Sequence, residues 1–265
     1  MAIWDDLLSD EDRARYEYYL EQNPRILGKR PVLVVIDVTK GFVQRGPTLE
    51  RMREVINNCG DDGWAAVAPM QSLVAQAREL GVPVIFTRGM PSGLRGGGWA
   101  NRSRAAGDAE MMDSGELAAR AERYELIDEL EPLPGEPVLA KRSASAFFQT
   151  PLLEYLNELD ADTLVCVGGT TSGCLRATVV DAASSSYYVA VVQEGCFDRF
   201  EVSHKTSLMD MNAKYAKVIS LAEASRYLRE DAQPIRAPHP PTAAPGRPGA
   251  ALTKPNPPRG GGAAR

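Results

Sequence analysis

The stretch PVLVVID, residues 31–37, decides the fold, because its apolar residues run without interruption and end on a carboxylate. An apolar run without polar alternation is typical of a central parallel strand that is buried on both faces of its sheet. Comparable strands are predicted further along the chain, at residues 82–88, 136–141, 163–169, 188–194 and 216–220. The strands are therefore spread over most of the chain.

Helical periodicity fills the intervals between these strands. Helices are predicted at residues 10–23, 61–80, 150–159, 174–186, 202–215 and 222–229. The helix over 61–80 depends on one apolar stripe, formed by Trp64, Val67, Leu73, Val74, Ala77 and Leu80. The alternation predicts an α/β fold, a three-layer doubly wound sheet of about six mainly parallel strands.

Composition bounds the class of protein. Of the 265 residues, 44% are hydrophobic and 25% are charged, which is ordinary for a globular protein and excludes disorder throughout. No apolar run approaches the roughly 18 residues of a membrane span, and the acidic N-terminus does not resemble a secretory signal. We therefore expect a cytoplasmic protein whose four cysteines are free thiols, and its two histidines disfavour a His-rich metal centre.

Three segments are expected along the chain. Residues 1–30 form an N-terminal helical arm, residues 31–231 form the α/β domain, and residues 232–265 form a disordered basic tail rich in proline and glycine. The tail carries five basic residues and no acid, so the rest of the chain is more acidic than the formal net charge of -5. An acidic body repels phosphates, and we expect neither a nucleic-acid nor a membrane partner.

Residues 89–116 interrupt the alternation of strands and helices. This stretch is rich in glycine, has no periodicity and contains Trp99. Loops of this length in compact domains are usually functional or disordered. A lid or subunit contact and a plain surface loop are both consistent with it.

The strongest local signal for chemistry is GGTTSGCLRAT, residues 168–178, where a strand ends and Cys174 comes close to the start of a helix. A helix N-terminus favours negative charge, so we expect a lowered pKa for this thiol and nearby N–H groups that stabilise an oxyanion. The alternatives are a small buried cysteine and a loop that binds phosphate. The sequence lacks both common phosphate-binding glycine motifs, which disfavours the last of these.

Asp37 and Lys141 also lie at predicted strand ends. The carboxyl ends of parallel strands meet at one edge of a sheet, where ligands bind in such folds. Taken singly, Asp37 is explained as a helix cap and Lys141 as a surface lysine. Together with Cys174 they form a set in which the carboxylate accepts the thiol proton and the ammonium stabilises the thiolate.

Three stretches carry a resemblance to a known family: VLVVIDVTKGFV (32–43), LAKRSASAFFQTPL (139–152) and VCVGGTTSGCLRATVVDA (165–182). They resemble the signature segments of the isochorismatase-like cysteine hydrolases, over roughly residues 25–230. The last stretch, with CFDRFEVSHK (196–205), is similar to the branch containing N-carbamoylsarcosine amidohydrolase and maleamate amidohydrolase.

The resemblance implies a catalytic triad of Cys174, Asp37 and Lys141. It also implies a cis peptide between Gly169 and Thr170, with the N–H groups of Thr170 and Cys174 as the oxyanion hole. Substrate-binding residues are implied as well, namely Arg199, which would hold a carboxylate, and Thr171, which would assist it. A salt bridge to Asp198 or Glu201 is the alternative for Arg199.

Cofactors and partners are also implied by the resemblance. Metal-binding relatives carry histidines after the second strand, where this chain reads TRGMP, residues 87–91, so no metal and no other cofactor is expected. Members of the family are usually homo-oligomers, tetramers or dimers. The N-terminal arm and residues 89–116 are the expected subunit contacts.

The function implied is a cysteine-dependent amidohydrolase. It would cleave a C–N bond of a small amide or N-carbamoyl substrate that bears a carboxylate, through a covalent thioacyl or thiocarbamoyl intermediate. Two alternatives stay open. One is a lactam or amide hydrolase of a secondary metabolite such as streptothricin, and the other is a non-catalytic binding scaffold.

Overall fold

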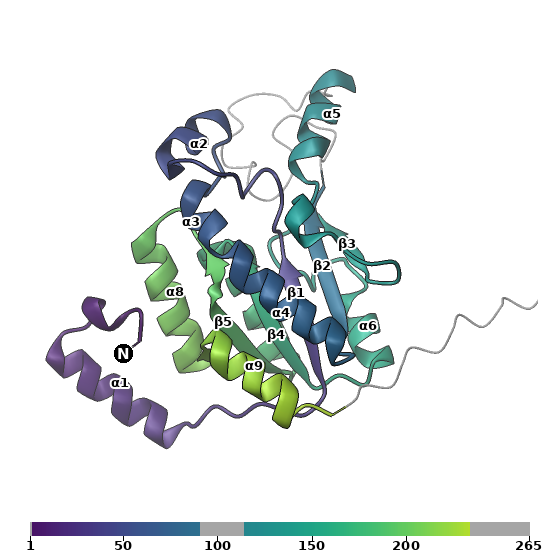
Figure 1. Ribbon diagram of the computed structural model, residues 1–265. Helices are drawn as coiled ribbons and strands as arrows, with labels where there is room; N and C mark the ends of the chain where they lie inside the picture. Colours follow the sequence, from purple (N-terminus) through teal and green to yellow (C-terminus); the bar gives the residue numbers. More distant parts are fainter. Residues whose placement is uncertain (1, 91–113, 234–265) are drawn as a thin grey trace, which may run out of the picture.

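Six parallel strands form one sheet at the centre of the computed structural model, which describes residues 2–90 and 114–233. The strands are β1 (Pro31–Ile36), β2 (Val84–Gly89), β3 (Val138–Lys141), β4 (Thr163–Gly169), β5 (Tyr188–Phe197) and β6 (Lys217–Ile219). They lie in the order β3-β2-β1-β4-β5-β6, and all neighbours pair in parallel (Figure 1). The predicted α/β sheet is confirmed, with strand boundaries shifted by a few residues.

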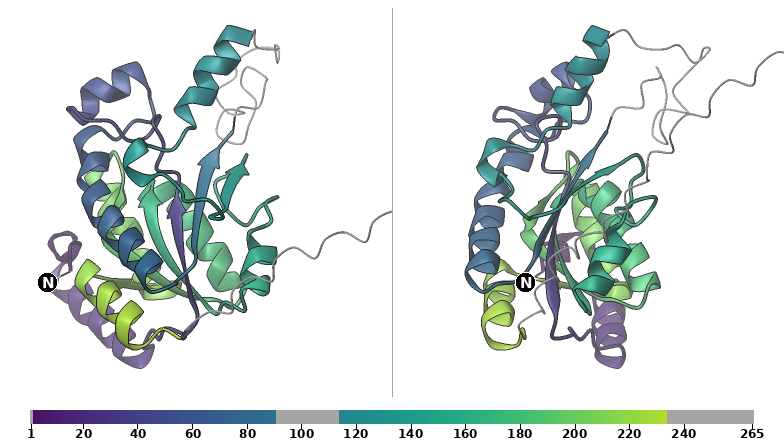
Figure 2. Two further views of the ribbon diagram at one scale, coloured as in Figure 1. Left: turned by 45° about the vertical axis from the view of Figure 1, so that its right-hand side comes forward. Right: turned by 90° about the vertical axis from the view of Figure 1, so that its right-hand side faces the viewer.

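Helices cover both faces of the sheet and form the outer two of the three layers (Figure 2). One face carries α4 (Val67–Glu79) and α9 (Leu221–Glu230), and the other carries α6 (Leu152–Glu158), α7 (Arg176–Ser184) and α8 (Glu201–Lys214). Side chains of β1 alternate between the two cores: Leu33 and Val35 pack under α4, whereas Val34 and Ile36 pack under α6 and α7. The unbroken apolar run of β1 therefore serves both faces.

The order of the strands reverses at β1 and β4, because the chain builds outward from β1 in one direction and from β4 in the other. Ile36 is in register with Gly168 at this point. Gly168 has a φ of +103, and a Cβ on it would lie 2.1 Å from the carbonyl oxygen of Ile36, so no other residue fits. Ligands bind beyond the strand ends at such a reversal.

The predicted helix over residues 61–80 is in fact two helices, α3 (Gly60–Ala65) and α4, which meet at Ala66. Pro69 explains the break, because proline lacks the N–H for the bond to residue i−4 and its ring clashes with that carbonyl. Within α4, Pro69 lies in the first turn, where this bond is not needed. The predicted apolar stripe is also wrong at its end, since Leu80 is 39% exposed.

Two further helices escape the sequence-based prediction, α2 (Thr48–Glu54) and α5 (Ser114–Arg123), and both lie beyond the carboxyl end of the sheet (Figure 1). No residue of α2 is buried, so the sequence has no apolar stripe that would predict this helix. The predicted loop is wrong at its edges, because Gly89 belongs to β2 and residues 114–116 belong to α5. The rest of it, including Trp99, lies outside the described residues.

The N-terminal arm lies against α8. It contains a 3-10 turn (Asp5–Leu7) and α1 (Asp10–Gln22), which Ser9 caps. The hydroxyl of Tyr16 in α1 donates a hydrogen bond to the carbonyl of Met209 in α8, at 3.1 Å. The boundary at residue 30 and the expected subunit contacts stay predictions, and the tail from residue 234 lies outside the described residues.

A second 3-10 turn (Asp128–Leu130) follows α5. In the described part of the chain, no helix combines the length and the apolar character that crossing a bilayer requires.

Candidate active site

Asp37 and Lys141 form a buried ion pair where the strand order reverses. Asp37 follows β1 with a φ of 50°, and Lys141 ends β3 and reaches across β2. Lys141 Nζ lies 2.7 Å from Asp37 Oδ2, and the two side chains are 2% and 3% exposed. The other carboxylate oxygen, Oδ1, accepts a hydrogen bond from the Thr87 hydroxyl at 2.7 Å. Both oxygens thus have the partner that a buried carboxylate requires.

Cys174 lies in a wide turn, Thr171–Leu175, between β4 and α7. The N–H groups of Gly173 and Leu175 both donate to the carbonyl of Thr170, which closes the turn. Gly173 has φ -109 and ψ -107, and a Cβ there would lie 2.6 Å from Thr170 Oγ1. The turn brings the Cys174 thiol close enough to Asp37 and Lys141 for both to shift its pKa, so the three predicted triad residues lie together.

The Cys174 thiol is protonated at neutral pH. Its pKa is raised to about 12, first by burial and then by the Asp37 carboxylate, while the Lys141 ammonium opposes the rise. Burial by itself lowers the pKa of Lys141, but the neighbouring Asp37 carboxylate and the Cys174 side chain outweigh burial and the pKa is raised. The lysine is therefore charged, and a thiolate forms only when a base accepts the thiol proton.

The expectation of a lowered thiol pKa is thus wrong. Cys174 comes before α7, which begins at Arg176, so the thiol is not inside the first turn of that helix. Burial decides the direction instead, and the Asp37 carboxylate adds to it because it disfavours a second negative charge beside it. Asp37 is the base within reach of the thiol.

The backbone before Cys174 has the unusual form that the family resemblance implies. The peptide bond between Gly169 and Thr170 is cis. Thr170 comes directly before the turn, which its carbonyl closes, and Cys174 is the next-to-last residue of the turn. The use of their N–H groups as an oxyanion hole stays a prediction.

Thr171, predicted to assist substrate binding, is fully buried. Its hydroxyl donates a hydrogen bond to the carbonyl of Phe197 at 3.0 Å and lies 2.8 Å from Nδ1 of His204. Ser172 follows it, and the Ser172 N–H and hydroxyl both donate to Asp198 Oδ2, at 2.8 and 2.6 Å. The turn is thereby tied to the connection between β5 and α8.

Arg199 lies in that same connection. Its Nη1 is 4.0 Å from Asp198 Oδ1, the limit for an ion pair, and the arginine side chain is 17% exposed. Its Nε is buried and finds no hydrogen-bond partner in the described part of the chain. The salt bridge weighed as the alternative for Arg199 is therefore weak, whereas Glu201 forms its ion pair with Lys205.

Sequence reasoning missed two residues that contact this site, Thr87 and His204. Thr87 is a fully buried polar residue near the carboxyl end of an apolar strand, a signal that points to a polar partner. His204 is one of only two histidines in the chain, and it follows Arg199 by five residues. Its contact with Thr171 depends on where α8 packs, which no local pattern records.

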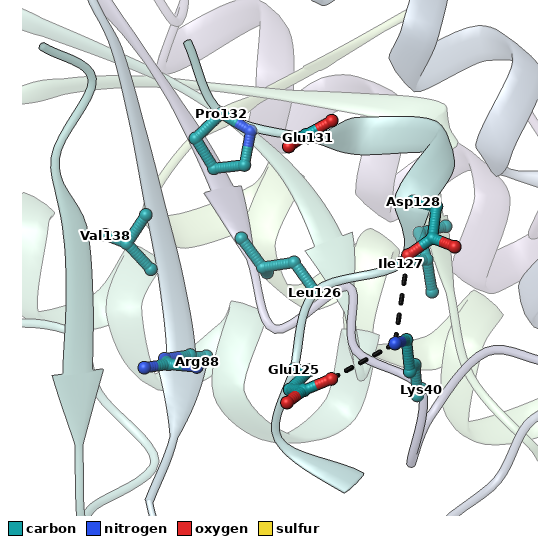
Figure 3. A pocket seen from close by; sticks show the side chains of 9 residues that line it. All are labelled: Lys40, Arg88, Glu125, Leu126, Ile127, Asp128, Glu131, Pro132 and Val138. Carbon is teal, nitrogen blue, oxygen red and sulfur yellow. Dashed lines mark hydrogen bonds and ion pairs between the residues drawn. The ribbon is translucent and has the colours of Figure 1, made fainter. Parts of the chain in front are cut away.

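A crevice of about 400 Å³ lies elsewhere, lined among others by Lys40, Arg88, Glu125 and Val138 (Figure 3). Neighbouring residues of a strand point to opposite faces, so Arg88 points away from the face to which Thr87 directs its hydroxyl. Lys40 forms ion pairs there with Glu125 and Asp128, at 3.1 and 3.8 Å. The crevice is therefore on the other side of the sheet from Cys174.

The described residues contain no group of three or more His, Cys, Asp or Glu side chains placed to hold a metal ion. The absence of a metal and of any other cofactor stays a prediction.

Residues 31–223 match the sequence profile of a family described as the isochorismatase domain. Among curated proteins, the chain is 34% identical to a maleamate amidohydrolase of Pseudomonas putida over 226 residues, which cover 84% of this chain and 98% of that one. It is 28% identical to an N-carbamoylsarcosine amidase of an Arthrobacter species, over 76% of this chain and 72% of that one.

Solved structures agree on the fold. A cysteine hydrolase from Pseudomonas syringae pv. phaseolicola superposes with a TM-score of 0.63 at 22% identity, covering 78% of this chain and 99% of that one. An N-carbamoylsarcosine amidase from Thermoplasma acidophilum superposes with a TM-score of 0.53 at 24% identity, covering 72% and 96%.

Proposed function

This chain belongs to the isochorismatase family, and from that premise we propose that it is a cysteine-dependent amidohydrolase of small amides. The observation that carries the proposal is the buried Asp37–Lys141 ion pair beside the Cys174 thiol, near enough for both residues to shift the pKa of the thiol. A nucleophile within reach of a base, and a base that is itself held by a third group, is the arrangement that covalent catalysis needs.

The first half of the reaction forms a covalent intermediate. Asp37 accepts the thiol proton as the sulfur of Cys174 attacks the carbonyl carbon of the amide. Lys141 stays charged and offsets the negative charge that moves from the carboxylate through the sulfur to the carbonyl oxygen. The N–H groups of Thr170 and Cys174 hold the oxyanion. The C–N bond then breaks, and the leaving nitrogen takes the proton from Asp37.

The second half returns the enzyme. Asp37, again a carboxylate, takes a proton from water as the water oxygen attacks the thioacyl or thiocarbamoyl carbon. The C–S bond breaks and the sulfur recovers the proton from Asp37. The products are ammonia or an amine and a carboxylic or carbamic acid.

We propose further that the substrate carries a carboxylate, which Arg199 binds. The two curated relatives are named for maleamate and N-carbamoylsarcosine, and each of these compounds carries a carboxylate. The Arg199 guanidinium is largely buried and has an unpartnered Nε and a distant ion-pair partner, so it retains donors for an anion. A planar guanidinium binds a carboxylate through paired hydrogen bonds.

Product release from a panel of substrates tests the proposal. The panel holds N-carbamoyl amino acids, maleamate, nicotinamide and cyclic lactams, with ammonia measured for the first three and ring opening for the last. We expect turnover of the carboxylate-bearing amides. Turnover of lactams alone would favour the lactam hydrolase, and no turnover of any compound would contradict the amidohydrolase.

Cysteine variants test the covalent step. Cys174→Ala is expected to retain less than about one percent of wild-type kcat, because the nucleophile is lost. Cys166→Ala is the matched control, since this thiol is buried in the middle of β4, away from the ion pair. Acid-quenched wild-type enzyme should carry the acyl or carbamoyl mass on the Cys174 peptide. Turnover by Cys174→Ala, or an adduct on another residue, would contradict the mechanism.

A further inference from the structure

The connection between β5 and α8 holds the turn that carries Cys174 at two successive residues. Thr171 is tied to the Phe197 carbonyl and to His204, and Ser172 is tied to Asp198. All three partners belong to the segment 197–204, which crosses from the end of β5 into the first turn of α8. The nucleophile turn is thus braced by a segment remote in sequence.

Proton accounting fixes the direction of the bond between Thr171 and His204. A hydroxyl has one proton, and a carbonyl oxygen only accepts, so the Thr171 proton goes to the carbonyl of Phe197. We therefore assign the proton of the His204 ring to Nδ1, which lies 2.8 Å from the same hydroxyl oxygen and donates to it. Among the described residues, the hydrogen-bond partner of the His204 ring is Thr171.

The protonation state of His204 agrees with this assignment. Burial lowers the pKa of the ring, although Asp198, Asp62 and Glu201 act against the fall. The ring is therefore neutral at pH 7 and has one proton to donate, which the contact with Thr171 assigns to Nδ1. Protonation of Nε2 at lower pH would leave the Nδ1–H in place.

We propose that His204 is a positioning residue that acts on the Cys174 nucleophile through Thr171. Thr171 stands between Thr170 and the rest of the turn, and the carbonyl of Thr170 accepts the bonds from Gly173 and Leu175 that set the turn. Fixing the Thr171 side chain therefore fixes both ends of the turn, including the two N–H groups of the proposed oxyanion hole. The inference rests on the proposed function, because positioning matters only where Cys174 reacts.

Two His204 variants separate the hydrogen bond from the bulk of the side chain. His204→Leu removes the donor and keeps the volume, whereas His204→Asn places an amide N–H near the position of Nδ1. We expect kcat of His204→Leu to fall about 10- to 100-fold with KM changed much less, since a displacement of about 1 Å at a reacting group has such an effect. His204→Asn should recover most of the loss.

Tyr16→Phe is the matched control. Tyr16 also anchors α8 by hydrogen bonds, to the Met209 carbonyl at 3.1 Å and from Asn212 Nδ2 at 3.0 Å, but on the side of the arm. A general loosening of α8 would lower Tm and kcat in Tyr16→Phe as in His204→Leu. The proposal expects Tyr16→Phe to lower Tm alone.

Alkylation of Cys174 by iodoacetamide, followed by peptide mass spectrometry, gives a readout that needs no substrate. Burial dominates the high pKa of this thiol, so a loosened turn should bring the pKa down towards its ordinary value of 9.0. Each pKa unit lost raises the thiolate fraction about tenfold below the pKa. We expect faster alkylation in His204→Leu and the wild-type rate in His204→Asn.

The outcomes separate this inference from the proposed function. A wild-type protein that turns over no amide but shows the alkylation pattern would refute the function and support the positioning role. Wild-type rates of alkylation in His204→Leu, or a folded His204→Asn that behaves like His204→Leu, would overturn the positioning role. If His204→Leu does not fold, the same hydrogen bond is tested from the Thr171 side. Thr171→Val removes the hydroxyl and with it the bond, whereas Thr171→Ser keeps both.

Discussion

Lys141→Met removes the cation from the buried pair with Asp37 and leaves the rest of the site in place. The methionine has a similar length, so the change opens little space. The Asp37 carboxylate, 3% exposed, then keeps the Thr87 hydroxyl at 2.7 Å but loses its cation. A buried carboxylate without its cation is unfavourable in the folded state, so the free energy of unfolding should fall.

The size of the effect follows from the burial. Removing one partner of a buried ion pair costs about 3–5 kcal/mol in the free energy of unfolding, whereas an exposed pair contributes less than about 1 kcal/mol. Asp37→Asn added to Lys141→Met removes the stranded charge, and asparagine tolerates the φ of 50° at this position. The double variant should therefore recover most of the loss and end within about 2 kcal/mol of wild type.

Urea unfolding of wild type, both single variants and the double variant completes the cycle. Arg15→Met is the control, because its pair with Glu11 is 69% and 74% exposed. Added salt should leave the Lys141→Met effect unchanged, since screening acts weakly on a buried pair. A loss below about 1 kcal/mol in Lys141→Met, or strict additivity in the double variant, would refute the reasoning.

Four further outcomes follow from the same contacts. Gly168→Ala should lower the free energy of unfolding by at least about 3 kcal/mol in urea, because its Cβ would meet the Ile36 carbonyl and its φ is positive; the control Gly81→Ala, with φ +70 and nothing within 4 Å, should lose far less. Arg199→Lys should lower kcat/KM at least about tenfold for a carboxylate-bearing amide and much less for an uncharged amide, and equal losses would make Arg199 structural. EDTA should leave turnover unchanged, whereas loss of activity that zinc restores would show that a metal takes part. The pKa of Lys141 in the folded protein is raised above its ordinary value of 10.5. The charged lysine should therefore contribute fully to stability below pH 10.5, and this contribution should decline as the pH rises through the pKa of the folded state. Unfolding curves between pH 9 and 12 should show this decline in wild type and not in Lys141→Met.

The sequence by itself determined the sheet and the edge of the sheet where the candidate catalytic residues meet. The apolar run of β1 requires two covering layers, because every second side chain must find a core on its own face. Parallel strands also put their carboxyl ends at one edge, so Asp37, Lys141 and Cys174 were predictable as neighbours from three separate stretches. These properties are periodic or local, and a sequence displays them directly.

Only the tertiary structure decided the charge state of the site and what holds it. The helix next to Cys174 suggested a reactive thiolate, but the pKa depends on burial and on a carboxylate brought in from another strand, and both raise it. The contact between His204 and Thr171 joins residues 33 positions apart, and it exists because α8 packs beside the turn. Electrostatic and hydrogen-bonding partners are the groups that lie close together in space. Folding brings them together, and their spacing along the chain does not show which groups will meet.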